Sequence, residues 1–171
     1  MNPRVRVRPA GRNYTVSFWF MMHENYHQVP TVICEVLEKH NGYTSSIDIC
    51  LNEHSEFALN THNRGSASTL VPVELKANEW YHLCFRQKSG FTWLYEQTLS
   101  VNGVLCINAK CWSLCNVAEL HFGSSDTRGR SLGDICMWDR WLQNLELFTI
   151  VKQYRRINDV NTSEFVLDEI V

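Results

Sequence analysis

The sequence lacks any long uninterrupted run of apolar residues. No stretch of its 171 residues approaches the roughly 18 consecutive apolar side chains that a membrane-spanning helix needs. Arginines also stand where a secretory signal peptide would carry its apolar centre. We therefore expect no membrane insertion within this chain. Its location stays open on these grounds, because a domain cut from a longer precursor would look the same.

A strong net charge is also absent. Sixteen Lys and Arg residues against 18 Asp and Glu residues give a formal net charge of −2, which argues against a nucleic-acid binder that works by bulk charge. Four arginines precede the first acid, Glu24, so 12 basic residues face the 18 acids in the remainder. We predict a basic N-terminal arm over 1–13, either a solvated segment or a site for sulfated glycan or phosphate, and one domain over 14–171. The arginines are Arg4, Arg6, Arg8 and Arg12.

Motifs for nucleophilic catalysis, phosphate binding and dinucleotide binding are missing. The chain contains no G-x-S-x-G turn, no P-loop and no dinucleotide fingerprint. It also lacks E-x-D-x-x-E, a pattern that would pair carboxylates on one strand of a sandwich glycosidase. These absences argue against nucleophilic, phosphate-loop and glycan-hydrolysing chemistry, and they leave one catalytic pattern to weigh.

That pattern is His23-Glu24-Asn25-Tyr26-His27, which matches H-E-x-x-H. In zinc peptidases this spacing puts two imidazoles on one helix face and supplies the Glu as general base, so it requires a helix over residues 18–28 here. The strand-favouring run at 14–20 and the nearby Pro30 favour a chance match in a loop. A zinc peptidase using His23, Glu24 and His27 is kept as an alternative. Its nominal third ligands are His40, His54 and His62.

Cysteine is abundant, and its count is odd. Seven cysteines cannot all pair within one chain, so at least one is free or bridges to another chain. None has the C-x-x-C spacing of a zinc or redox site, which favours disulfides over metal. Two N-glycosylation sequons, at Asn13 and Asn161, agree with an oxidising, secreted setting. The disulfide candidates are Cys34, Cys50, Cys84, Cys106, Cys111, Cys115 and Cys136.

Hydrophobic residues mostly recur with period two, which is typical of half-buried strands. Ten short runs of this kind predict an all-β fold, a two-sheet antiparallel jelly-roll sandwich. The Asn-Gly pairs at 41–42 and 102–103 are signals for tight hairpin turns. The predicted strands are 14–20, 31–37, 46–52, 56–60, 69–75, 80–87, 92–97, 104–108, 118–122 and 133–138.

One segment departs from this pattern. Apolar residues at helical spacing over 142–155 predict one short C-terminal helix, and the tail over 163–171 is a candidate for a last strand beside the first. In the run over 80–87, alternation assigns two opposite faces. Tyr81, Leu83 and Phe85 are placed on the core face, and His82, Cys84 and Arg86 on the other.

Three segments, in order, resemble the pentraxin and laminin-G families of the concanavalin A-like superfamily. They are YTVSFWF at 14–20, NEWYHLC at 78–84 followed by LSVNG at 99–103, and GDICMWD at 133–139. The last segment is similar to pentraxins in particular. The resemblance implies a jelly-roll domain over residues 14 to about 152. Pentraxins carry a disulfide at the positions that match Ser17 and Cys84, so half of that bridge is missing here.

The resemblance also implies where a ligand would bind. The family's calcium site uses an Asp-Asn pair in one loop and acidic and amide residues before the G-D-I strand. Here the matching loop over 123–130 holds one carboxylate, Asp126, and the arginines Arg128 and Arg130, while the loop around Asn41 offers no acid. Calcium needs six to eight oxygens, so we expect calcium binding to be lost and no cofactor. The candidate ligand-binding residues are Asp126, Arg128, Arg130 and Asn41, with the arginines meeting an anionic group.

These expectations add up to a non-catalytic extracellular recognition or adhesion module in a larger secreted protein or receptor ectodomain. A protein ligand is favoured over an anionic or sulfated glycan, because the metal site that presents glycans is eroded. A homo-oligomer is also implied as an option, since pentraxins form rings. A second alternative is an intracellular structural interaction domain whose seven cysteines are all reduced.

Overall fold

The structure of the protein is a computed structural model, which describes residues 5–7, 11–23, 31–40, 43–62, 65–69, 71–90, 94–112, 118–122 and 129–159. The described residues form eleven strands and one helix. The strands are β1 (Val5–Val7), β2 (Tyr14–Met22), β3 (Thr31–His40), β4 (Tyr43–Leu51), β5 (Phe57–His62), β6 (Gly65–Thr69), β7 (Tyr81–Ser89), β8 (Leu94–Val101), β9 (Val104–Trp112), β10 (Ala118–Phe122) and β11 (Arg130–Trp138). The helix is α1 (Asn144–Asp159).

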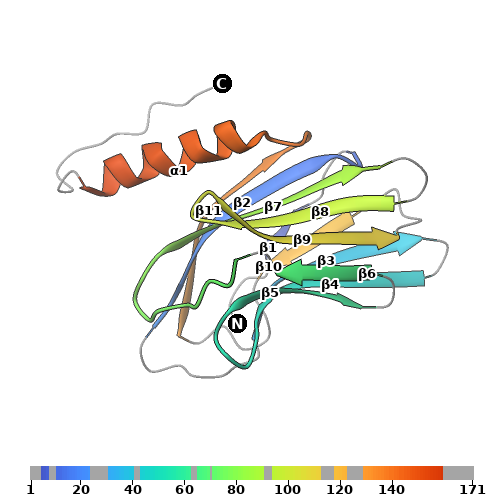
Figure 1. Cartoon of the computed structure of the whole chain (residues 1–171), viewed down its shortest axis with the longest axis horizontal. Helices are drawn as coiled ribbons and strands as arrows, with labels where there is room; N and C mark the ends of the chain where they lie inside the picture. Colours follow the sequence, from blue (N-terminus) through green and yellow to red (C-terminus); the bar gives the residue numbers. More distant parts are fainter. Residues whose placement is uncertain are drawn as a thin grey trace.

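The strands make two antiparallel sheets that pack face to face (Figure 1). The five-stranded sheet has the order β1-β10-β3-β4-β5, and the six-stranded sheet has the order β11-β2-β7-β8-β9-β6. Neighbours such as β2 and β7 are far apart in sequence. This is expected for a jelly roll, where the chain crosses between the two sheets and strands distant in sequence pair within one sheet. The predicted fold class, an all-β two-sheet jelly-roll sandwich with one short C-terminal helix, is confirmed.

The core fills the space between the two sheets. Both inner faces contribute large apolar side chains with almost no solvent exposure, including Phe18 and Phe122, whose rings meet edge to face with centroids 5.0 Å apart. On β7 the inward residues are Tyr81, Leu83 and Phe85, as the alternation predicted. Strand alternation therefore sorts β7 correctly into a core face and an outer face.

One predicted strand is misplaced. The sequence pattern predicts a strand over 69–75, but β6 covers Gly65–Thr69, and residues 71–80 make only an isolated bridge between Glu56 and Glu74. Pro72 has no N–H to give to a ladder, which explains why an apolar run fails to continue the strand there. The helix begins at Asn144, two residues later than predicted, and the tail over 163–171 lies outside the described residues.

The predicted N-terminal arm contains a strand. Residues Val5–Val7 pair with β10, with Arg6 opposite His121, at the edge of the five-stranded sheet. At the other end of the arm, the carbonyl of Arg12 accepts a hydrogen bond of 3.3 Å from Gln87. The division at residue 13 itself stays a prediction.

The turn between β8 and β9 matches its sequence signal. Asn102 and Gly103 both have positive φ, 52° and 82°, as a two-residue hairpin of this handedness requires. A Cβ built on Gly103 would lie 3.7 Å from Val151, so α1 rests directly on this turn. Among the residues described, no helix combines the length and the apolar character needed to cross a membrane.

Candidate functional site

The predicted ligand loop is only partly described. Asn41, Asp126 and Arg128 lie outside the described residues. Arg130 is half-buried at the start of β11, and its Nη2 donates a 2.6 Å hydrogen bond to the hydroxyl of Thr31 at the start of β3. That bond ties the two sheets together at this end. The assignment of this loop as a ligand site stays a prediction.

The zinc-peptidase alternative is wrong in its structural requirement. It needs a helix over residues 18–28, but β2 remains extended to Met22. His23 follows that strand, is exposed, and its Nε2 lies 3.0 Å from the hydroxyl of Ser131. The strong β propensity of 14–22 and its pairing with β7 and β11 on both sides explain the extended conformation. Glu24 and His27 lie outside the described residues, and the described part holds no group of three metal-ligating side chains.

Four of the expected disulfide cysteines are buried free thiols: Cys34, Cys50, Cys84 and Cys106. Burial raises the pKa of each, to about 11 for Cys50 and about 12 for Cys84, so these thiols stay protonated and unreactive at neutral pH. The expected bridges are therefore not present at these four positions. Cys136 is half-buried, while the Cys111 side chain and Cys115 lie outside what the structure describes.

The lost family disulfide has a clear location in the fold. Ser17 lies opposite Cys84 in the pairing of β2 with β7, as the resemblance implied, and opposite Cys136 in the pairing of β2 with β11. The serine thus stands between two cysteines on the outer face of the six-stranded sheet. Of the sequons, Asn13 is exposed and its Oδ1 accepts hydrogen bonds from Ser89, whereas Asn161 lies outside the described residues.

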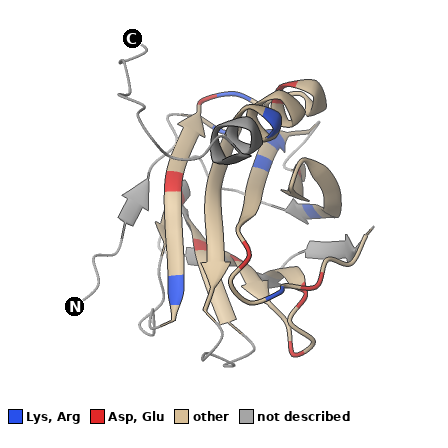
Figure 2. Cartoon of the chain, turned by 90° about the vertical axis from the view of Figure 1, so that its left-hand side faces the viewer, with Lys and Arg blue, Asp and Glu red and all other residues tan. Residues whose placement is uncertain are grey.

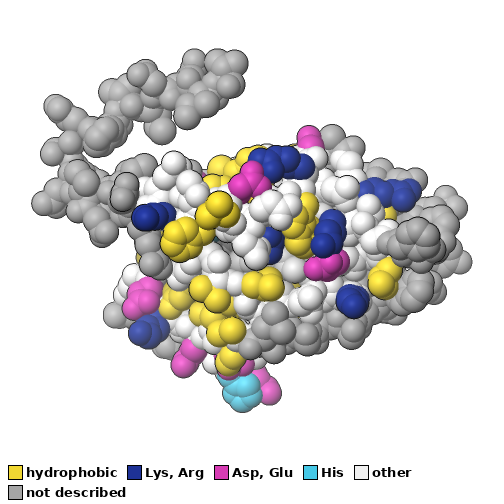
Figure 3. Space-filling view, turned by 45° about the horizontal axis from the view of Figure 1, so that its top comes forward, with side chains coloured by type: hydrophobic (Ala, Val, Ile, Leu, Met, Phe, Trp, Pro, Cys, Tyr) yellow, Lys and Arg dark blue, Asp and Glu magenta, His cyan; other side chains and the backbone are white. Residues whose placement is uncertain are grey.

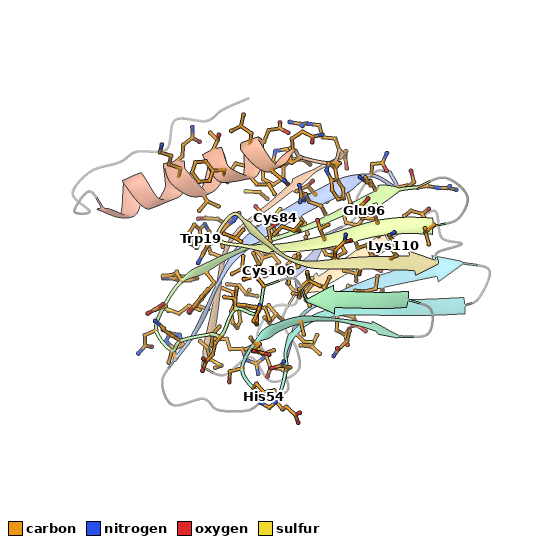
Figure 4. All side chains as sticks on the ribbon, in the orientation of Figure 1. Trp19, His54, Cys84, Glu96, Cys106 and Lys110 are labelled. Atoms are coloured by element: carbon orange, nitrogen blue, oxygen red, sulfur yellow. The ribbon has the colours of Figure 1, made fainter. Side chains whose placement is uncertain are left out.

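The helix α1 covers part of this outer face (Figure 1). Its residue Leu147, together with Leu142 just before it, packs on Cys84 in a small apolar cluster that is separate from the core. Figure 4 shows Cys84 under the helix and Glu96 and Lys110 on strands to one side of it. The outer face is therefore divided into a covered half and an open half.

A buried arginine fixes the start of the helix on the sheet. Arg86, which is 2% exposed, donates from Nη1 to the carbonyl of Leu142 and to Oδ1 of Asn144, both at 2.8 Å. Its Nε donates to the Thr98 hydroxyl at 3.1 Å, and its guanidinium lies 4.5 Å from the centre of the Trp141 ring. Burial lowers the pKa of Arg86, but three polar partners and an aromatic ring compensate the buried charge.

Two further contacts hold the turn before the helix. The Thr15 hydroxyl donates to the carbonyl of Arg140 at 2.8 Å and accepts from the Leu142 N–H at 2.9 Å. The Glu146 carboxylate accepts the N–H of Gln143 at 2.7 Å and both Nη atoms of Arg140, which holds its pKa down at about 2. This acid in the first turn satisfies the N–H of Gln143, the residue before the helix, and suits the helix dipole.

A row of charges crosses the open half of the face. Lys88 on β7 forms a 2.8 Å ion pair with Glu96 on β8, and Glu96 lies opposite Lys110 on β9. The Lys88 ammonium also lies 4.7 Å from the centre of the Trp141 ring. We call Lys88, Glu96 and Lys110 the charged row. Strand spacing puts its two lysines about 10 Å apart at their backbones.

Apolar side chains are exposed on α1 and at the end of β9 away from Lys110. Leu145 and Phe148 on α1 are 76% and 55% exposed, and Val104 beside the β8–β9 turn is 54% exposed. Lys152 lies 6.0 Å from the Phe148 ring. We call the charged row together with Val104, Leu145, Phe148 and Lys152 the helix face. Figure 3 shows apolar and cationic side chains side by side on this surface.

The helix face was not predicted from the sequence. Alternation predicted that Arg86 points outward, and the same alternation applied to the next two strands also places Glu96 and Lys110 outward. No sequence signal shows that α1 folds back onto this face and leaves Leu145 and Phe148 in solvent, because both fit the apolar periodicity of the helix.

An antiparallel sandwich with these strand orders and a helix on one outer face defines a concanavalin A-like β-sandwich domain. The chain belongs to the concanavalin A-like lectin/glucanases superfamily, since a laminin-G-type family model of that description matches residues 3–140. This confirms the resemblance to laminin-G and pentraxin domains. No curated protein matches the chain significantly over its sequence.

Solved structures with similar folds have low sequence identity to this chain. A Trypanosoma rangeli sialidase in complex with 2,3-difluorosialic acid has a TM-score of 0.63 at 9% identity, covering 85% of this chain and 23% of the sialidase. The receptor binding domain of botulinum neurotoxin D scores 0.58 at 12% identity, with 90% and 42% covered. A heptameric SAP-like pentraxin from Limulus polyphemus scores 0.52 at 18% identity, with 88% and 77% covered. This chain therefore spans about a quarter of the sialidase, and these likenesses describe the fold.

Proposed function

We propose that this chain is a non-catalytic extracellular recognition module carried by a larger secreted protein or a receptor ectodomain. The observation that carries the proposal is the helix face, where exposed apolar side chains and cations stand on strands and a helix held in place by Arg86. Sites on rigid elements suit binding, because little conformational entropy is lost on association. Membership of a superfamily described as lectins and glucanases supports a binding role.

The favoured ligand is a protein, and an anionic glycan is the second candidate. In this proposal Asp126, Arg128 and Arg130 from the segment 123–130 and Asn41 from an earlier loop contribute to ligand binding, without calcium and without any other cofactor. The structural likeness to a receptor binding domain and to a pentraxin supports recognition of other molecules as the role of this fold. A homo-oligomer remains part of the proposal, and sedimentation of the purified chain tests it.

Binding to cells tests the proposal directly. We expect fluorescent tetramers of the full chain to bind a subset of cell types saturably, and brief protease treatment of those cells to remove the binding. Heparinase treatment that removes it instead would identify a sulfated glycan as the ligand. Absence of saturable binding to every cell type and extracellular matrix tested would contradict a recognition role.

N-glycosylation tests the proposed extracellular location of the chain. A chain expressed behind a signal peptide is expected to carry N-glycan at Asn13, whose side chain is exposed, and to lose one glycan's mass in Asn13→Gln. Secretion with neither Asn13 nor Asn161 glycosylated would remove this support. Gln is the matched control, because it keeps the amide while removing the acceptor.

A second candidate function is an intracellular structural interaction domain with all cysteines reduced. The four buried free thiols favour it, since oxidising compartments promote disulfides. Thiol labelling of protein unfolded without reductant separates the two candidates. Seven titratable thiols support the intracellular candidate, and five or fewer, which require at least one disulfide, exclude it.

A further inference from the structure

The apolar end of the helix face points to contact with another molecule. Leu145 and Phe148 lie one turn apart on α1, and Val104 lies beside the β8–β9 turn, where the Phe148 backbone is 3.8 Å from a Cβ built on Gly103. Large apolar side chains exposed together mark an interaction site more often than a scattered single one does. The other exposed apolar residues, Val71, Trp80 and Leu132, belong to other segments.

The charges on the same face indicate the charge of the surface that a partner presents. Within the described part of the chain, neither Lys110 nor Lys152 forms an ion pair with a carboxylate. The carboxylate of Glu96 is already engaged by Lys88 at 2.8 Å, so Lys110 keeps its charge available to a partner. The Lys152 ammonium lies 6.0 Å from the centre of the Phe148 ring, so an apolar anchor and a cation are neighbours on this face. A protein partner that pairs these cations presents carboxylates, since Asp and Glu are its anionic side chains.

The dimensions of the face also suit a protein. Val104 and Lys110 lie six residues apart on β9, or about 20 Å at strand rise. A surface of that length, with apolar anchors at one end and charged residues along it, has the extent of a standard protein–protein interface. The Arg86 contacts and the Thr15 hydroxyl hold α1 in place before binding, so the anchors are preorganised.

We propose that the helix face docks a protein partner that presents an apolar pocket bordered by carboxylates. The inference rests on the proposed recognition role and names the surface and the partner chemistry that serve it. Leu145 and Phe148 enter the pocket, Lys152 pairs with a carboxylate at its border, and the charged row fixes the orientation. Aromatic and aliphatic anchors supply most of the affinity in such interfaces, and the charges supply orientation and speed of association.

A display library of random peptides is the probe for this chemistry. The library is selected on the full wild-type chain alone, and the enriched peptides are then measured on the double variant Leu145→Ser/Phe148→Ser. We expect enriched peptides to combine Leu, Phe or Trp with Asp or Glu. Their affinity should fall at least tenfold on the double variant and on Lys110→Glu/Lys152→Glu. It should be unchanged on Val71→Ser, the matched control for an exposed apolar residue elsewhere.

Three outcomes would overturn the inference. One is no enrichment over the naive library. Another is enriched peptides that bind the double variant as tightly as the wild type, which places recognition elsewhere. The third is a wild-type chain that binds no peptide but is retained on a heparin column, with the retention lost in Lys110→Glu/Lys152→Glu. That result would make the surface a polyanion site. Saturable binding of the wild-type chain to cells separates a wrong surface from a wrong function. Cell binding persists if the chain recognises its partner through another surface, and it is absent if the chain has no recognition role.

Discussion

The two faces of β7 are built from the same strand but serve different purposes. The inner face places Tyr81, Leu83 and Phe85 in the core, where they interlock with the facing sheet. The outer face carries His82, Cys84 and Arg86, which are equally buried yet lie under or beside α1. The inner face makes the sandwich, and the outer face attaches the helix that carries the exposed anchors. Mutations on the two faces should therefore separate stability from recognition.

The largest effect is expected on the inner face. Phe85→Ala removes a fully buried ring that packs near Tyr14, with ring centroids 6.1 Å apart, and should lower the free energy of unfolding by about 3–5 kcal/mol. Urea denaturation measures the change. Lys88→Ala, on the outer face of the same strand, is the control and should change it by less than about 1 kcal/mol. Equal losses in the two variants would refute the difference between the faces.

A disulfide can be restored on the outer face. Ser17→Cys places a thiol directly opposite Cys84 and Cys136, and paired residues on neighbouring strands are about 4.5–5.5 Å apart at Cα, within disulfide reach. After oxidation we expect two fewer titratable thiols than in the reduced variant and a gain of about 2–4 kcal/mol in stability. Ser17→Ala provides the control for loss of the hydroxyl. Persistence of all the thiols after oxidation would show that the register or the side-chain direction is different.

Acid should weaken the outer face through His82. Burial against Trp19 lowers the pKa of His82 from its ordinary 6.5 to about 4, and its Nδ1 has no hydrogen-bond partner in the described structure. Between pH 6.5 and 4 the unfolded chain binds a proton that the folded chain does not, so stability is complete above 6.5 and falls as the pH drops.

The total loss from this site is about 3 kcal/mol, reached below pH 4. The free energy of unfolding is measured across this pH range in the wild type and in His82→Leu. We expect the variant to lose a smaller part of its stability on acidification. Identical pH profiles for the two proteins would rule out His82 as the cause.

A smaller effect is expected at the helix attachment. Arg86→Met keeps the length of the side chain but removes three hydrogen bonds and leaves the Leu142 carbonyl unsatisfied, for a loss of about 2 kcal/mol. Hydrogen exchange should quicken in α1 while β2 and β7 keep their protection. Lys88→Met, which removes a partly exposed ion pair and the contact of the ammonium with the Trp141 ring, is the control. Uniformly faster exchange in strands and helix would mean that Arg86 supports the whole sandwich.

The sequence predicted much of the fold because alternation, turn residues and helical periodicity act locally. The Asn102-Gly103 turn and the outward position of Arg86 were both read correctly. The strand over 69–75 was wrong, because apolar character outweighed Pro72 in the sequence pattern. The helix face could not be predicted, since it depends on where α1 lies relative to β7 and β8, and no local pattern encodes that contact. The H-E-x-x-H match was correctly given less weight than a chance match, because the strand-favouring run that precedes it is incompatible with the helix that the motif requires.

The most direct test of the account is cell binding by the double variant Leu145→Ser/Phe148→Ser beside the wild-type chain and Val71→Ser. Both anchors are exposed, so the account predicts unchanged secretion and thermal stability, with at least a tenfold loss of saturable binding in the double variant alone. Full binding by the double variant, at wild-type stability, would contradict the assignment of recognition to the helix face.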